Sequence, residues 1–150
     1  MQNTHLTAIS GCLQNSFQFC TMLPYLFAWF PMLLLAIANG SLREFIFKKH
    51  MSDLAAHQLS TATLIVLFSV YIYFVLQKFP PDSLQQALFI GILWMAMTEI
   101  FEFCFGLIRG LGWQVMLADY NIAAGRLWLL IPTWLLVAPV IAHFIQVRNG

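Results

Sequence analysis

Four long apolar runs constrain this chain of 150 residues more than any other feature. A helix needs about 20 residues, within a range of ~17 to 25, to cross a hydrocarbon core about 30 Å thick. The runs of suitable length are residues 22–38, 59–76, 84–105 and 126–145. They lack the alternation of apolar and polar residues that is typical of barrel strands. Because the backbone must satisfy its own hydrogen bonds in lipid, each run is expected to be a helix. The predicted fold is an all-α integral membrane bundle of four transmembrane helices.

The composition excludes several classes of soluble protein. Hydrophobic residues make up 61% of the chain and charged residues 9%, against roughly 45 to 50% and about 25% in soluble domains. So few charges cannot cover a water-exposed globule, which argues against a soluble enzyme, a nucleic-acid binder and a disordered chain. The net charge is +1, and the three cysteines form no C-x-x-C pair. Membrane lipid is therefore an expected partner, and nucleic acid is not.

The segments before and after the first run have different characters. Residues 1–21 are predicted to be a polar N-terminal tail, and residues 22–150 the four-helix transmembrane domain. Beyond the first run, Leu42, Phe45 and Ile46 share one helical face. This pattern predicts a short interfacial helix between the first two spans, lying along the membrane surface.

Capping residues mark the starts of two of the predicted helices. Ser52 or Asp53 is expected to cap the helix that contains the second run. Ser83, with Gln86 three residues later, fits a capping box that opens the third helix. Since only a tight turn separates the second and third runs, these two helices are expected to be antiparallel.

Basic residues are distributed unevenly between the two sides of the predicted bundle. The first and third connections hold or adjoin five of them, Arg43, Lys48, Lys49, Arg109 and Arg126, whereas the other side has Lys78 and Arg148. Cytoplasmic loops carry an excess of Lys and Arg, so both termini are expected outside and the two longer connections in the cytoplasm. With an external N-terminus, Cys12 and Cys20 would meet an oxidising compartment, where they either pair or remain free thiols.

Two acidic residues, Glu99 and Glu102, lie within the third run. A charge at the centre of a membrane helix costs about 2.5 to 3.5 kcal/mol on insertion scales, so such residues generally face the protein interior. Their separation of three puts both on one helical face, roughly 5 to 10 Å below the helix end. Eight further polar residues from all four helices reach the same level: Asn39, Arg43, Glu44, His57, Arg109, Asp119, Asn121 and Arg126. We therefore predict one polar pocket, open to the cytoplasm, that holds a small ion or an anionic ligand.

The chemistry of the two glutamates has three interpretations. Paired with the arginines at this level, they are structural ion pairs. With one titrating carboxyl, they form a proton- or cation-coupled site between helices. A metal site of Glu99, Glu102 and His57 is disfavoured, because the carboxylate-bridged metal centres of helix bundles use Glu-x-x-His pairs. No metal and no cofactor are predicted.

The arginines and the histidine in this set also have alternative roles. Arg43, Arg109 and Arg126 are either anchors whose charged ends reach the lipid interface or donors that bind a carboxylate or phosphate in a planar fork. His57 is either a hydrogen-bonded residue at the start of the second helix or a ligand or base.

Four strings lie between Ala38 and Leu130, namely NGSLREF, AAHQLS, TEIFEF and ADYNIAAGRLW. Together they resemble uncharacterised small bacterial four-span inner-membrane proteins. The resemblance implies an architecture and a location in a bacterial inner membrane, and it implies no activity. The sequence has no HExxH, GxSxG, Walker or Rossmann pattern.

Three classes of function remain open. The first is a transporter or channel-like protein for a small ion or anionic ligand, with proton coupling as one form of it. Four helices make a thin wall, so a homo-oligomer is expected to accompany this function. The second class is a membrane-embedded enzyme acting on a lipid headgroup, and the third is a structural or assembly subunit of a membrane complex. The sequence does not decide whether the protein is an enzyme.

Overall fold

The computed structural model describes the backbone of residues 2–118 and 120–149, with the side chains of residues 21–118 and 120–148. All regular secondary structure in that part of the chain is helical. The long helices are α1 (Gln2–Leu42), α3 (Asp53–Lys78), α4 (Leu84–Ile108) and α6 (Leu130–Asn149). Each contributes a span long and apolar enough to cross a membrane, which for the first is Thr21–His50. The predicted all-α membrane bundle is confirmed.

The first connection differs in form from the predicted interfacial helix. A π-helical turn, η1 (Arg43–Phe47), and one turn of α-helix, α2 (Lys48–His50), follow α1 without a break. In η1 the backbone N–H of Lys48 reaches back five residues to the carbonyl of Arg43. The segment therefore prolongs the first span, and the extra residue per turn changes which side chains face the bundle.

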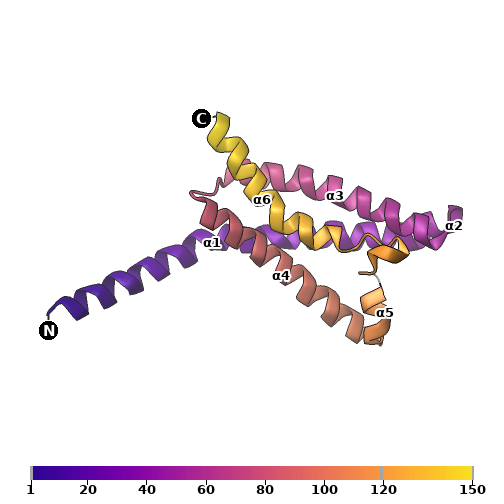
Figure 1. The fold of residues 1–150 in the computed structure, drawn as a ribbon, viewed down its shortest axis with the longest axis horizontal. Coiled ribbons are helices and arrows are strands. Elements are labelled where there is room, and N and C mark those ends of the chain that lie inside the picture. Colours follow the sequence, from indigo (N-terminus) through magenta and orange to yellow (C-terminus); the bar gives the residue numbers. More distant parts are fainter. Residues whose placement is uncertain (1, 119, 150) are drawn as a thin grey trace.

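The N-terminal segment is helical where the structure describes it. From residue 2 onward, the predicted tail is continuous with the first span in α1, and it projects away from the bundle (Figure 1). The side chains of Cys12 and Cys20 lie outside the described residues. The choice between a disulfide and two thiols stays a prediction.

The predicted capping residues begin α3 and α4. Ser52 Oγ accepts a hydrogen bond from the N–H of Ala55 at 3.4 Å. Ser83 Oγ accepts one from the N–H of Gln86 at 3.2 Å. The Gln86 side-chain oxygen in turn accepts from the N–H of Asp82 at 2.6 Å, so the reciprocal bond of the capping box forms one residue earlier than expected.

The fourth span begins at Leu130, after the predicted start at residue 126. Pro132 then falls in the first turn of α6, where a missing N–H removes no helical hydrogen bond. The apolar residues 127–129 extended the prediction too far, because they form an irregular segment and a turn before the helix. Arg126 consequently belongs to the third connection, together with α5 (Trp113–Ala118) and the 3-10 helix η2 (Ile122–Ala124).

The four spans pack around one another in the order α1, α3, α6, α4. α3 and α4 run away from their short connection in diverging directions (Figure 1). α1 and α6 each pack against both of them. The second and third spans are thus consecutive along the chain but are bridged by the first and fourth spans.

The hydrophobic core lies in the half of the bundle nearer the α3–α4 turn. Tyr25 of α1 reaches this turn and donates its hydroxyl hydrogen to the carbonyl of Phe79 at 3.1 Å. The fully buried Trp94 of α4 donates from Nε1 to the carbonyl of Tyr25 at 2.8 Å. The core comprises Tyr25, Trp29, Met32, Leu64, Phe68, Ile72, Leu76, Ile90, Trp94, Ile131, Leu135 and Ala138. Large apolar side chains fill this half, so polar groups collect at the other end.

Candidate functional site

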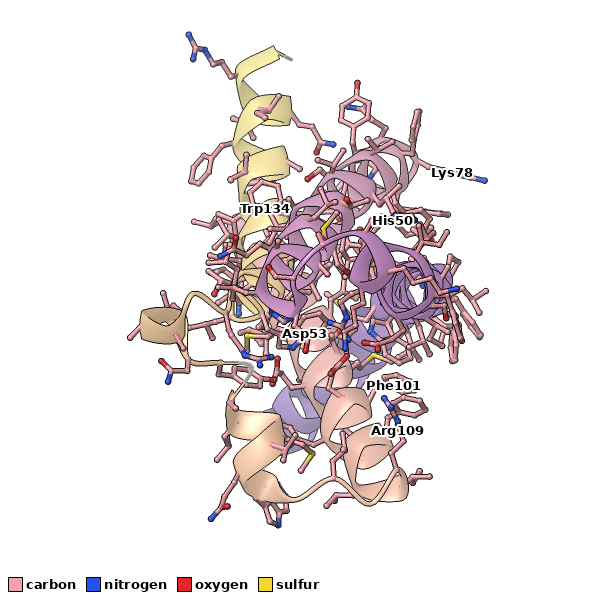
Figure 2. All side chains as sticks on the ribbon, turned by 90° about the vertical axis from the view of Figure 1, so that its right-hand side faces the viewer. His50, Asp53, Lys78, Phe101, Arg109 and Trp134 are labelled. Atoms are coloured by element: carbon pink, nitrogen blue, oxygen red, sulfur yellow. The ribbon has the colours of Figure 1, made fainter. Side chains whose placement is uncertain are left out.

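The polar end of the bundle is where η1 follows α1, α3 begins and α4 ends. Figure 2 looks onto this end, with Asp53 near the middle of the view and Arg109 on α4 below it. The chain delivers charged groups here because helix ends and their connections tolerate charge better than the centres of membrane helices do. The predicted pocket residues that the structure describes are found at this end.

A cavity of about 430 Å³ opens between η1, α2, the start of α3 and the third connection. We call it the basic cavity, and its lining residues are Arg43, Lys48, Asp53, His57, Gln114, Val115, Ala118 and Arg126. Three of these side chains are permanently basic and one is acidic. Glu44 contacts Arg43 and Lys48. Even when its negative charge is counted, the side chains at this cavity keep an excess of positive charge.

Arg43 is held in place at the edge of the basic cavity. Its Nη1 lies 3.4 Å from Nδ1 of His57, and its Nε donates to Glu44 Oε1 at 3.3 Å. A guanidinium has no acceptor, so Nδ1 of His57 must be the accepting atom. His57 is only 4% exposed, and this buried ring therefore fixes the orientation of the Arg43 side chain.

The acidic residues beside the cavity organise Lys48. The Nζ atom of Lys48 lies 2.9 Å from Glu44 Oε2 and 3.6 Å from Asp53 Oδ1. Glu44 and Asp53 are 43% and 78% exposed in these pairs, and exposed ion pairs contribute little to stability, about 0 to 1 kcal/mol. Their clear effect is positional, because they keep the ammonium group at the cavity wall.

A second cavity, of about 280 Å³, lies between the end of α1 and the end of α4. We call it the lateral cleft. Its polar lining comprises Asn39, Ser41, Arg43, Glu44, Ser60, Glu102 and Arg109, and its apolar side chains include Ala36, Ile37, Phe45, Leu64, Phe101, Phe105 and Trp128. Arg43 borders both this cleft and the basic cavity. The polar side chains thus line more than one space, whereas the sequence predicted a single pocket.

A smaller cavity of about 110 Å³ adjoins the cleft under the third connection. Arg43, Glu102, Arg109 and Trp128 line both spaces, and Tyr120 enters the smaller one from the connection. Glu102 therefore lines the same two spaces as Arg43 and Arg109, two of the three predicted arginines. Arg126 lies on the basic-cavity side instead.

Glu99 interacts with the third connection. Its Oε2 accepts a hydrogen bond from the Tyr120 hydroxyl at 2.6 Å, whereas its buried Oε1 has no hydrogen-bond partner among the described residues. The Tyr120 ring stacks on Phe103, with 6.2 Å between the ring centroids. Burial raises the pKa of Tyr120, and the hydrogen bond to Glu99 and the charges of Glu99 and Glu102 raise it further. The hydroxyl consequently keeps its proton and remains a donor.

Two of the predicted pocket residues have hydrogen bonds that hold the fold. Asn39 Nδ2 donates to the carbonyl and the hydroxyl of Ser60 at 2.9 and 2.7 Å, which links α1 to α3. The side chain of Asn121 accepts from the N–H of Ala124 at 3.2 Å and caps η2. Asn39 still lines the lateral cleft, while Asn121 is engaged within its own loop. Asp119 lies outside the described residues.

Several lining residues were missed at the level of the sequence: Lys48, Asp53, Gln114, Tyr120 and Trp128. The only available signal for Tyr120 was its position in the polar string ADYN, which does not tell where the ring points.

Within the described part of the chain, no group of three or more His, Cys, Asp and Glu side chains is arranged to hold a metal ion.

Comparison of the chain with protein-family models, with curated proteins and with solved structures gives no match.

Proposed function

We propose that the protein is a membrane transporter that binds a small anionic ligand in the basic cavity. The observation that carries the proposal is the meeting of Arg43 and Lys48, from the first connection, with Arg126, from the third, while Asp53 is the one carboxylate in the lining. Guanidinium groups bind carboxylate and phosphate oxygens through paired hydrogen bonds. A volume of about 430 Å³ falls in the range of small-molecule sites.

The packing of the rest of the bundle favours a transporter over an open channel. The half beyond the cavity is filled by the aromatic and aliphatic core that surrounds Trp94 and Phe68. A packed core beyond the cavity suits a transporter that exposes its binding site to one side of the membrane at a time. Four spans are few to enclose a transport pathway, and a second copy of the chain would complete the wall around it.

The orientation and location belong to the same proposal. The basic residues at the polar end favour the cytoplasmic side, because loops rich in Lys and Arg remain there. Both termini are then outside, and the cavity takes its ligand from, or releases it to, the cytoplasm. On the sequence resemblance to four-span proteins of bacterial inner membranes, we place the protein in such a membrane as part of this proposal.

The test is anion binding and uptake by the protein in lipid. We expect inorganic phosphate or succinate to bind wild-type protein in nanodiscs, measured by calorimetry, and to be taken up by proteoliposomes. Arg126→Gln should weaken binding about tenfold or more, since one lost charge-assisted hydrogen bond is worth about 1.4 kcal/mol or more. Arg148→Gln, which changes an exposed arginine in the last turn of α6, should leave binding unchanged.

A second variant tests the same site if Arg126→Gln protein does not fold. Lys48→Gln removes a cation whose ion pairs are largely exposed, so the protein should fold and still lose affinity. The unfolding midpoint is measured for every variant. Two results would refute the proposal. One is wild-type protein that binds neither phosphate nor succinate better than chloride. The other is Arg126→Gln and Lys48→Gln proteins that bind these anions as well as Arg148→Gln protein does.

A further inference from the structure

The lateral cleft differs from the basic cavity in where it lies and in what lines it. It runs between α1 and α4, two helices with spans suited to cross the membrane. Ile37 on one wall is 48% exposed and Phe105 on the other is 46% exposed, so both walls continue onto surfaces suited to hydrocarbon. An occupant of the cleft can therefore have an apolar part that remains in the membrane.

The charges in the cleft are balanced. Two guanidinium groups, of Arg43 and Arg109, face two carboxylates, of Glu44 and Glu102. The basic cavity has three basic side chains and one acidic one in its lining. An anion suits the basic cavity, whereas a group that carries both a positive and a negative charge suits the cleft, because each of its charges then meets an opposite one.

Arg109 is the group most clearly available to a ligand. Its guanidinium lies 5.7 Å from the centre of the Phe105 ring, and among the described residues no carboxylate forms an ion pair with it. Figure 2 shows Arg109 on the same side of α4 as Phe101, a residue of the cleft. A guanidinium that packs on an aromatic ring at the edge of the hydrocarbon is well placed to bind a phosphate.

We propose that the lateral cleft binds a phospholipid whose head group joins a phosphodiester to a primary ammonium. The phosphodiester contacts Arg109 and Arg43, and the ammonium donates hydrogen bonds to Glu102. The acyl chains lie along the exposed apolar faces of α1 and α4, because about 280 Å³ holds a head group and not a whole lipid. This site is additional to the anion site. The two share Arg43, but Arg109 and Glu102 do not line the basic cavity.

The test is selective retention of lipid. The protein is purified from bilayers containing equal amounts of phosphatidylethanolamine, phosphatidylcholine and phosphatidylglycerol, and the retained lipids are identified by native mass spectrometry. We expect phosphatidylethanolamine to be retained about tenfold over the other two lipids. Phosphatidylcholine has no N–H to donate to Glu102, and phosphatidylglycerol has no positive charge.

Matched variants assign the retained lipid to the cleft. Arg109→Gln should reduce retention of phosphatidylethanolamine about tenfold, and Glu102→Gln should remove the preference over phosphatidylcholine. Lys49→Gln, which removes an exposed cation at the same end of the bundle, should change neither. Ile37→Trp fills the cleft from its lipid-facing wall without altering charge, so it should also reduce retention of phosphatidylethanolamine. This variant keeps the test decisive if Arg109→Gln protein does not fold.

Three outcomes would overturn the lipid site. Phosphatidylglycerol retained as well as phosphatidylethanolamine would mean that the cleft only attracts negative charge. Equal retention by Arg109→Gln, Ile37→Trp and Lys49→Gln proteins would mean that the lipid binds elsewhere. An unchanged preference in Glu102→Gln protein would remove the carboxylate from head-group recognition. Arg126→Gln, which tests the anion site, should leave lipid retention intact, so failure of one proposal is distinguishable from failure of the other.

Discussion

Replacing Gly91 by alanine should lower the free energy of unfolding by about 3 kcal/mol, at the upper end of the usual cost of overpacking. Gly91 is buried in α4, and a Cβ atom added there would overlap the backbone carbonyl oxygen of Leu136 in α6. Backbone cannot move aside as the end of a flexible side chain can. The α4–α6 interface would have to separate along its length to admit one methyl group. Thermal unfolding in detergent, followed by tryptophan fluorescence, measures the effect.

Gly40→Ala is the matched control for this prediction. Gly40 also lies within a helix, in α1, but a Cβ atom added there would have no neighbour within 4 Å. The exchange should be neutral or stabilise by about 0.5 to 1 kcal/mol, because alanine has the higher helix propensity. If both variants unfold at the same temperature, the close approach of α4 and α6 is not what fixes their packing.

The sequence predicts the membrane helices well because hydrophobic length is a direct physical requirement. The runs at residues 59–76 and 84–105 lie inside α3 and α4, and Ser52 and Ser83 cap these helices as expected. The start of α6 was wrong because apolarity alone does not separate a helix from an apolar turn before it. Gly91 has a sequence signal in retrospect, since Ala87 and Gly91 are small residues spaced for close helix packing.

The division of the polar end could not be predicted in the same way. Helical periodicity placed Glu99 and Glu102 on one face, and the position of Arg43 after the first span placed it at the same level. The structure does bring Arg43 and Glu102 to the same cleft. Periodicity does not reveal the π-helical turn η1, which begins at Arg43. Nor does it reveal that Tyr120, far along the chain, folds back onto Glu99. Both features depend on tertiary contacts that leave no repeating pattern.

Replacing Tyr120 by phenylalanine should lower the free energy of unfolding by about 2 kcal/mol, within the range for hydrogen bonds to charged groups. The hydroxyl is the donor to Glu99 Oε2, and the other carboxyl oxygen is buried without a hydrogen-bond partner among the described residues. Phenylalanine keeps the ring that stacks on Phe103. The change therefore isolates the hydroxyl, and thermal unfolding at neutral pH measures its contribution.

A double-mutant cycle with Glu99→Gln tests whether this cost belongs to the pair. Glutamine keeps an acceptor for Tyr120 but not the charge, so Tyr120→Phe should cost roughly 1 kcal/mol in the Glu99→Gln background, the usual value for a neutral hydrogen bond. An equal cost in both backgrounds would show that the hydroxyl does not act through Glu99.

The pH dependence of the same variant gives a second, independent check. The pKa of Tyr120 is raised above its ordinary value of 10.0, first by burial and then by Glu99. A raised pKa in the folded state means that the hydroxyl's stabilisation is fully present below pH 10.0 and is lost as the pH rises through the folded pKa. Wild-type protein should therefore be more stable than Tyr120→Phe protein by a constant margin at neutral and mildly alkaline pH, and this margin should narrow only above pH 10.0. A margin that instead disappeared well below that pH would contradict a proton-donating tyrosine in the third connection that is hydrogen-bonded to Glu99.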